Sequence, residues 1–155
     1  MNFAHVFAAL TVLAGATVHA GARLEGKVLM SPDPSTAQIE KQWGFADAVV
    51  TGDKIYLSGV VVGVHEGETD LTVAYGRAFD QIGSILKSAG ASWDDVVDIS
   101  SFHTDLVTQM PAIVAVKNRY VKAPFPAWTA IQVARLIPPN GVTEIKIVAA
   151  VPKKK

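Results

Sequence analysis

The residue with the clearest chemical potential is a glutamate inside an apolar run. Glu144 lies within residues 143 to 151, which are otherwise almost entirely hydrophobic. Burying a carboxylate without a partner is expensive, and enzymes use such positions to tune acids that exchange protons. Glu144 is therefore either a site acid or a residue paired across a subunit interface. Ser58 and Gly59 lie within another β-rich run, residues 55 to 62, where they offer a hydroxyl beside a backbone N–H.

Other reactive patterns are weaker. His103 and Asp105 could form an acid–base pair, but a strand end beside a helix cap explains them equally simply. Ser58 is not a nucleophile elbow, because it lacks a second flanking glycine and no helix follows it. The segment from Gly59 to Gly63 is not a phosphate loop, since no Lys-Ser or Lys-Thr follows it.

Composition excludes several classes of function. The chain has no cysteine, which removes disulfides, thiolate metal sites and cysteine nucleophiles. The four histidines lack metal-ligand spacing, so we expect neither a metal nor a cofactor. Lys plus Arg is 14 and Asp plus Glu is 14, so the net charge is zero, and we expect no nucleic-acid partner. The only basic cluster, residues 153–155, is a solvated tail.

The first 20 residues have the pattern of a signal peptide. No charged side chain precedes Arg23, and the apolar run is shorter than the ~20 residues of a membrane-spanning helix. Small residues at Val18 and Ala20 predict cleavage after Ala20. We therefore expect an exported, periplasmic protein whose mature form has no membrane segment. The pattern lacks a basic residue at its start; an uncleaved anchor or a mis-assigned start codon, the latter giving a cytoplasmic protein, are the alternatives.

Hydrophobic periodicity predicts an α+β fold. We expect residues 21–42 to form an extension and residues 43–152 to form one domain. Two strands flank a hairpin turn at 51–54, and a helix over 71–89 is capped by Thr69 or Asp70 and ended by Gly90. The remaining elements are a short turn at 92–95, a strand at 96–104, a helix at 107–121, and strands at 128–134 and 143–151.

The resulting order is β-β-α-β-α-β-β, a mixed sheet with both helices on one face. The apolar run of the last strand predicts burial on both of its faces. The sheet is apolar over more surface than two helices can cover, and this favours an oligomer.

This order, together with several motifs, resembles the RidA family, also called the YjgF or L-PSP endoribonuclease-like family. The motifs are IYLSG from Ile55, FHTDL from Phe102, PAWTAIQVARL from Pro126 and VTEIKIVAA from Val142. The resemblance covers residues 43–152. It implies a chorismate-mutase-like fold, a homotrimer and small-molecule clefts between subunits. It also implies hydrolysis of reactive 2-imino or 2-aminoacrylate intermediates to 2-keto acids and ammonia.

One position departs from the family pattern. In a Pro-Ala-Arg-Ser/Thr motif, the family's arginine holds the substrate carboxylate, but here Trp128 occupies that place. Tryptophan has one N–H donor and no charge, so we expect weak or absent activity on simple imino acids. An aromatic wall suits an apolar, aromatic or cationic ligand. Trp128 is either a wall of the cleft or plain interface packing.

The resemblance implies further site residues. Glu144 corresponds to the acid that positions the attacking water and Ser58 to the site serine, so these two form the catalytic set. The substrate-binding set is Trp128, Phe45, Gly59, Thr129, Ala130 and Tyr120. Phe45 stands where many members have tyrosine, and Ala130 where many have cysteine. The second-helix residue that faces the cleft is either Val114 or Lys117.

Three functions follow from these features. The first is a RidA-like hydrolase or deaminase with an altered substrate. The second is a non-catalytic ligand-binding or chaperone-like trimer, which the absent arginine favours and Glu144 disfavours. The third, ribonuclease action, fits least well because the chain has neither a basic groove nor a histidine pair.

Overall fold

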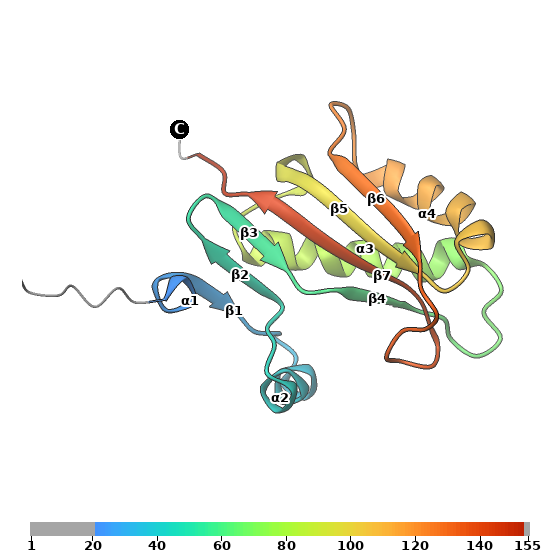
Figure 1. The fold of residues 1–155 in the computed structure, drawn as a ribbon, viewed down its shortest axis with the longest axis horizontal. Helices are drawn as coiled ribbons and strands as arrows, with labels where there is room; N and C mark the ends of the chain where they lie inside the picture. The colour runs from blue at the N-terminus through green and yellow to red at the C-terminus, as the bar shows by residue number, and fades with distance from the viewer. Residues whose placement is uncertain (1–20, 154–155) are drawn as a thin grey trace, which may run out of the picture.

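Seven strands form one sheet in the computed structural model, which describes residues 21–153 (Figure 1). The strands are β1 (Lys27–Leu29), β2 (Ala48–Thr51), β3 (Lys54–Leu57), β4 (Val60–Gly63), β5 (Val96–His103), β6 (Ala127–Gln132) and β7 (Gly141–Ala150). Their order is β1-β2-β3-β7-β5-β6, and β4 also pairs with β7. Only the β5–β6 pair is parallel among these, because α4 (Leu106–Tyr120) crosses between the two strands.

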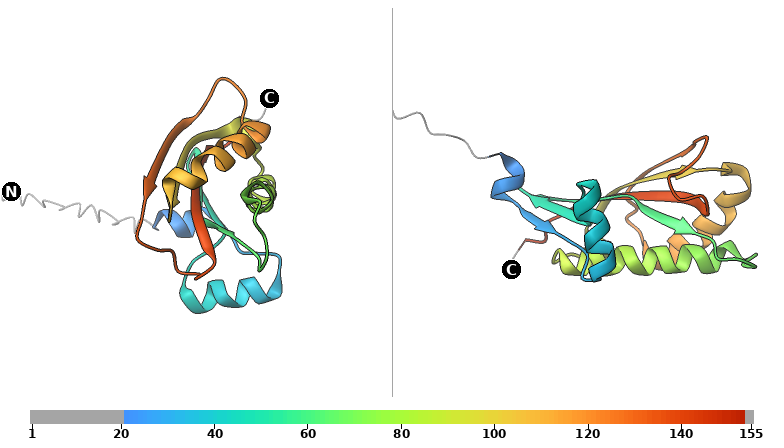
Figure 2. Two further views of the ribbon diagram at one scale, coloured as in Figure 1. Left: turned by 90° about the vertical axis from the view of Figure 1, so that its right-hand side faces the viewer. Right: turned by 90° about the horizontal axis from the view of Figure 1, so that it is seen from below.

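Two long helices cover one face of the sheet, as the sequence predicts. They are α3 (Leu71–Ser88) and α4, and both lie on the same side (Figure 2). Asp70 caps α3 by accepting a hydrogen bond from the Thr72 N–H at 2.8 Å, and Asp105 caps α4 through the Thr108 N–H. Gly90, with φ of 85°, follows α3. The turn at Trp93–Asp95 precedes β5.

The uncovered side of the sheet, which we call the open face, is half-exposed in the single chain. In β7 the side chains of Thr143, Ile145, Ile147 and Ala149 are buried toward the helices. The alternate positions 142, 144, 146 and 148 lie on the open face, where Lys146 is exposed. The expected burial of this strand on both faces is therefore wrong for one chain.

The second predicted strand is split. The strand is interrupted at Ser58 and Gly59, and its two parts, β3 and β4, pair with different parts of β7. The break places Ser58 at the end of β3, directly before a turn onto the next strand. The sequence predicts one continuous run here because apolar residues occur on both sides of the break.

The N-terminal extension has more structure than its mixed sequence indicates. It forms α1 (Ala22–Glu25), β1 and α2 (Pro34–Trp43), and β1 pairs with β2 as an edge strand. Asp33 caps α2 by accepting from the Thr36 N–H at 2.8 Å, and Gly44 ends it with φ of 74°. The signal-peptide prediction concerns residues outside the described range. Within residues 21–153 no helix has the length and apolar character needed to cross a membrane.

A pair of carboxyl groups joins α2 to the start of the sheet. Glu40 is fully buried; its Oε2 accepts from the Ser31 N–H at 2.9 Å, while its Oε1 has no hydrogen-bond partner. The Asp47 carboxyl lies beside it, and burial together with Glu40 raises the pKa of Asp47 to about 6. The contact between the two carboxyl groups is most stable when one of them carries a proton, because two carboxylates would repel each other.

Replacing Asp47 with asparagine should stabilise the protein at neutral pH. The folded chain binds the Asp47 proton more tightly than the unfolded chain, so the stabilisation is complete below about pH 4 and is lost as pH rises through about 6. Asparagine cannot ionise and can donate to Glu40. For this half-buried group, screening leaves a gain of about 1–2 kcal/mol at pH 7.5. Urea denaturation at pH 4.5 and 7.5 measures it.

The control is Asp94→Asn, at an exposed position in the turn before β5. It should change the free energy of unfolding by less than about 0.5 kcal/mol at both pH values. An Asp47→Asn gain that is equal at pH 4.5 and pH 7.5 would show that ionisation of the pair is not its cause.

Candidate functional site

Seven of the predicted site residues fall into two groups on different parts of the chain, and Tyr120 lies apart from both on α4. Phe45, Ser58 and Gly59 lie at the ends of β2 and β3, and Glu144 lies nearby on β7. Trp128, Thr129 and Ala130 lie on β6, at the far edge of the sheet. β7 and β5 separate β6 from β3, so one chain does not bring the two groups together.

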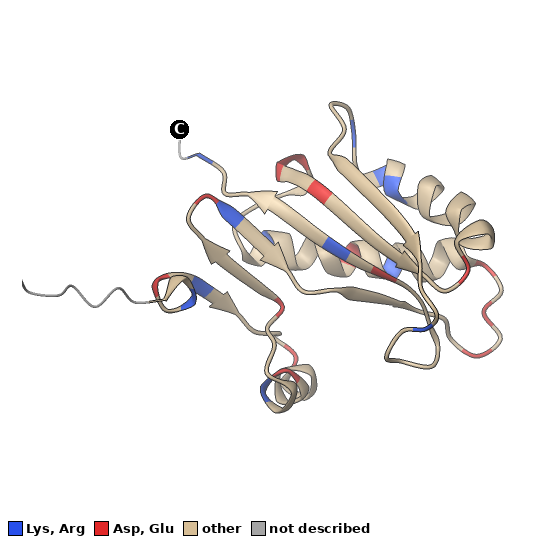
Figure 3. Cartoon of the chain, viewed as in Figure 1, with Lys and Arg blue, Asp and Glu red and all other residues tan. Residues whose placement is uncertain are grey.

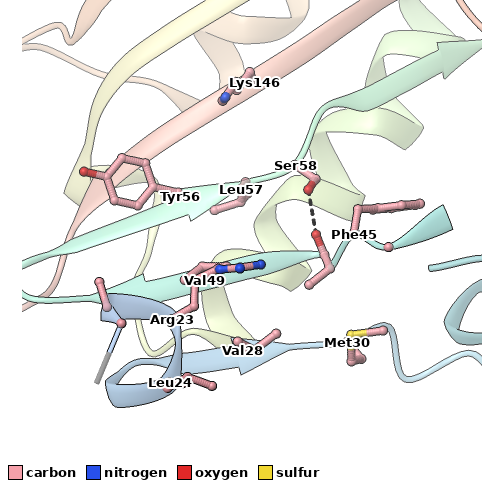
Figure 4. A pocket seen from close by; sticks show the side chains of 14 residues that line it. Arg23, Leu24, Val28, Met30, Phe45, Val49, Tyr56, Leu57, Ser58 and Lys146 are labelled. Carbon is pink, nitrogen blue, oxygen red and sulfur yellow. Dashed lines mark hydrogen bonds between the residues drawn. The ribbon is translucent and has the colours of Figure 1, made fainter. Parts of the chain in front are cut away.

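The first group borders a pocket of about 870 Å³ on the open face, which we call the open-face pocket (Figure 4). Phe45 and Ser58 line it, as do residues of the N-terminal extension. Its remaining lining comes from Gly21, Ala22, Arg23, Leu24, Val28, Met30, Gly44, Ala46, Val49, Tyr56, Leu57 and Lys146. Most of this surface is apolar, and its polar side chains are an arginine, a lysine, a tyrosine and a serine.

The hydroxyl of Ser58 already has a structural partner. Its Oγ donates to the Ala46 carbonyl oxygen at 2.6 Å, while the Ser58 N–H donates to the Asp47 carbonyl oxygen at 2.9 Å. These bonds fix the end of β3 against the segment that carries Phe45. With its proton committed, Ser58 is suited to accept a hydrogen bond from a ligand rather than to attack one.

Glu144 packs directly against Gly59. A Cβ atom at position 59 would lie 2.6 Å from the carboxyl carbon of Glu144, so only glycine lets the carboxylate approach the backbone this closely. Glu144 does not itself line the open-face pocket. It contacts Gly59, the residue after the lining Ser58, and lies two positions along β7 from the lining Lys146.

Lys146 and Arg23 are pocket residues that the sequence does not single out. Lys146 follows Glu144 by two positions in β7, and strand alternation puts both on the open face. That period-2 pattern is the signal that could have identified Lys146. Arg23 lies in α1, within the segment predicted to be an extension, so no sequence pattern ties it to the sheet.

Trp128 faces the helix side of the sheet rather than the open face. It pairs with Ile99 of β5, whose side chain is buried under the helices. The indole Nε1 donates to Ser101 Oγ at 3.0 Å. Lys117 Nζ lies 5.0 Å from the ring centroid, a cation–π arrangement.

Of the two second-helix candidates, Lys117 is therefore the one that contacts Trp128. It is 8% exposed, its Nζ donates to Asn118 Oδ1 at 2.9 Å, and burial lowers its pKa. The Phe125 ring centroid also lies 5.8 Å from Nζ. At the edge formed by α4 and β6, the partly desolvated Lys117 ammonium is therefore near two aromatic rings.

Trp128 is also the outer end of a buried polar network. Ser101 Oγ contacts His103 Nε2 at 2.9 Å, and His103 Nδ1 lies 3.2 Å from Gln109 Oε1 and 3.1 Å from Thr143 Oγ1. Burial lowers the pKa of His103, so the ring is neutral at neutral pH. With Asp105 engaged in capping α4, His103 is a structural residue here.

The other predicted binding residues are dispersed. Thr129 is exposed on the open face, in a cross-strand row with Ser100 and Lys146. Ala130 pairs with Ser101 and so lies on the same face as Trp128. Tyr120 packs between α3 and α4, where its hydroxyl donates to Asp80 Oδ1 at 2.7 Å and its ring contacts Phe79.

The charged residues of the described part of the chain are scattered along the fold (Figure 3). Residues 21–153 contain no group of three or more histidine, aspartate or glutamate side chains able to hold a metal ion.

Comparison with known proteins places the chain in a family. The family described as Endoribonuclease L-PSP matches residues 35–151. The RutC family protein YjgH of Escherichia coli strain K12 is 36% identical over 113 residues, covering 71% of this chain and 85% of that protein. A 2-iminobutanoate/2-iminopropanoate deaminase of Capra hircus is 32% identical over 121 residues, covering 74% and 86%. The chain belongs to this family, which the sequence identifies as RidA or YjgF.

Solved structures confirm the fold class. Protein YjgH has a TM-score of 0.68 at 32% identity, with 82% of this chain and 96% of that chain covered. Rv2704 of Mycobacterium tuberculosis, described as a member of the YjgF/YER057c/UK114 family, has a TM-score of 0.70 at 24% identity, with 81% and 99% covered. The chorismate-mutase-like α+β fold predicted from the sequence is therefore confirmed.

Proposed function

We propose that this protein is a deaminase-type hydrolase acting on enamine or imine acids with an apolar side chain. One observation carries the proposal: the carboxylate of Glu144 is packed against Gly59, the neighbour of Ser58, and Ser58 lines a largely apolar pocket. Family membership, with relatives named as imine deaminases, supports the reaction type.

The reaction requires one water molecule and two proton transfers. As the water oxygen bonds to the imine carbon, Glu144 takes one proton from the water and passes it to the imine nitrogen, which gives a carbinolamine. Glu144 then carries the proton of the carbinolamine hydroxyl to the nitrogen while the C–N bond breaks, so that ammonia leaves and the C=O bond of a 2-keto acid forms. A positioned carboxylate suits both transfers, and the Gly59 backbone offers a dipole beside the reacting carbon.

A trimer would unite the two groups of site residues. The cleft would then combine the open-face pocket of one subunit with the Trp128 edge of the next, so that Trp128, rather than an arginine, meets the ligand. The half-exposed apolar open face supports this assembly. We also propose, from the sequence pattern of residues 1–20, that the protein is exported and that its mature chain starts at Gly21.

A non-catalytic ligand-binding trimer is the second candidate. Two observations favour it: the proton of Ser58 is committed to the Ala46 carbonyl oxygen, and Trp128 carries no charge. A binder would sequester an apolar ligand in the same pocket without turnover. Ribonuclease action, which the family description names, has no basic groove to support it in this neutral chain.

The test measures ammonia release from two substrates generated in situ. We expect the protein to accelerate hydrolysis of the imino acid formed by oxidation of leucine, and to act at least about tenfold more slowly on 2-aminoacrylate, which cannot fill an apolar pocket. No acceleration with either substrate would favour the binding module. Faster hydrolysis of 2-aminoacrylate would contradict the altered specificity.

A variant at Trp128 tests whether its side chain forms a wall of the ligand cleft. Trp128→Arg alone would place a guanidinium beside the Lys117 ammonium, so it is combined with Lys117→Gln. In a folded protein, this pair of changes should increase activity on 2-aminoacrylate. The Lys117→Gln variant is the matched control. No gain would show that Trp128 is interface packing rather than a cleft wall.

A further inference from the structure

A second hollow lies between α3 and the loop that joins β1 to α2. Residues 29–32, Asp47 and four residues of α3 between Gln81 and Ser88 line it, and we call it the α3 hollow. Its volume is about 230 Å³. A water molecule occupies roughly 30 Å³ in the liquid, so the α3 hollow has room for a small organic ligand.

The α3 hollow has one ionisable side chain in its lining, that of Asp47. The Glu40 carboxyl, which is fully buried, lies against it. Glu40 Oε1 has no hydrogen-bond partner among the described residues. A buried acceptor without a donor is costly, so this pair of carboxyl groups lacks a positively charged donor.

No neighbouring cation supplies that donor within the described part of the chain. The ion pairs formed by residues 21–153 are Lys54 with Asp53 and Arg77 with Glu68, so neither includes Glu40 or Asp47. From β1, the Lys27 ammonium instead donates to the Ser88 carbonyl oxygen at 3.3 Å.

The residues that α3 contributes to the hollow are all uncharged. The Ser84 hydroxyl donates to the Asp80 carbonyl oxygen and the Ser88 hydroxyl to the Ser84 carbonyl oxygen, each at 3.0 Å. Because these protons are used within the helix, the two hydroxyl oxygens remain able to accept. Leu29 and Ile85 add apolar surface. The lining thus suits a donor that carries a short hydrocarbon chain.

We propose that the α3 hollow binds a small primary alkylammonium ion, with the ammonium against Asp47 and the hydrocarbon chain against Leu29 and Ile85. An ammonium has three N–H donors and a full positive charge, so it would replace the proton that Asp47 and Glu40 otherwise share. The site is separate from the open-face pocket, and the inference does not rest on the proposed function.

A metal ion suits the α3 hollow less well than an ammonium. Glu40 Oε2 already accepts from the Ser31 N–H at 2.9 Å, so this carboxylate cannot chelate a metal through both oxygens. Residues 21–153 also provide no group of three histidine, aspartate or glutamate side chains that could hold a metal. Calcium requires six to eight oxygen ligands, whereas an ammonium needs about three acceptors.

Binding should depend on pH, because the alkylammonium and a proton compete for the same two carboxyl groups. Burial and the contact with Glu40 raise the pKa of Asp47 to about 6, so the pair holds a proton below that pH. The affinity for an alkylammonium should therefore be highest above pH 7 and should fall about tenfold between pH 7.5 and pH 5.

Isothermal titration calorimetry tests the inference with n-butylammonium and with 1-butanol, a neutral molecule of nearly the same shape. At pH 7.5 n-butylammonium should bind at least about tenfold more tightly, because hydrogen bonds to charged groups are the stronger ones. Equal affinities, or no binding of n-butylammonium, would overturn the proposal. Calcium chloride is titrated separately, and Ca²⁺ binding that displaces n-butylammonium would assign the hollow to a metal ion instead.

Two variants and a control locate the site. Asp47→Asn, which we expect to be folded and more stable, should weaken n-butylammonium binding at least about tenfold and remove its pH dependence, with 1-butanol binding within about twofold. Ser84→Val narrows the hollow and removes an acceptor, so it should weaken both probes about fivefold. Asp94→Asn should change neither affinity. Binding of n-butylammonium that is unchanged in Asp47→Asn or in Ser84→Val would overturn its placement in this hollow.

Discussion

Replacing Glu144 with glutamine should lower the rate of ammonia release from an apolar imino acid by about 100-fold or more, the typical contribution of a positioned acid or base. Glutamine has nearly the same shape and so can occupy the space beside Gly59, but it cannot take a proton from water. Steady-state kinetics should show the loss in kcat, with KM changing less than about threefold.

The outcome distinguishes catalysis from binding. Glu66→Gln, at an exposed position in the loop before α3, is the control and should leave kcat unchanged. Unchanged kcat in Glu144→Gln would show that another group activates the water.

The fold of residues 45–152 could be predicted from local patterns. α3 and α4 each combine a helical apolar period with an aspartate cap, and these local interactions determine both helices. The paired strands β2 and β3 follow from the turn at Gly52, whose φ is 57°. The helix ends and strand runs are encoded by neighbouring residues, which is why sequence and structure agree there.

The N-terminal extension could not be predicted in the same way. α2 has only one buried residue, and that residue is Glu40, so no apolar period marks the helix. β1 has three residues and gains its structure by pairing with β2, which is distant in the sequence. Tertiary contacts rather than local preference determine both elements, and with them the position of Arg23.

The candidate site also contains residues whose positions could be predicted from the sequence and one whose position could not. Ser58, Gly59 and Glu144 come together as the resemblance implies, because β4 pairs with β7 next to the turn that contains Ser58. Trp128 could not be placed from its motif alone, because one residue of register decides which face of β6 its side chain occupies. The pairing of Trp128 with Ile99 puts the indole under the helix layer, in contact with Lys117 and Ser101.

The hydrogen bonds of the buried polar network beneath Trp128 should contribute to the free energy of unfolding. Replacing Thr143 with valine should lower the free energy of unfolding by about 2–3 kcal/mol, because it leaves the Tyr75 hydroxyl without its partner and removes a contact from His103. Valine matches the volume of threonine, so the loss reflects hydrogen bonding rather than a cavity. Thermal and urea denaturation measure it, and the melting temperature should fall by roughly 5–10 °C.

The exposed Thr129→Val is the matched control and should change stability by less than about 0.5 kcal/mol. A double-mutant cycle with Tyr75→Phe isolates the hydrogen bond. With the phenolic hydroxyl absent, valine at position 143 no longer leaves a buried donor unpaired, so its cost should fall by about 1 kcal/mol or more. If Thr143→Val costs the same in both backgrounds, the Tyr75–Thr143 bond does not stabilise the core, and the network would serve only to orient Ser101 and the indole above it.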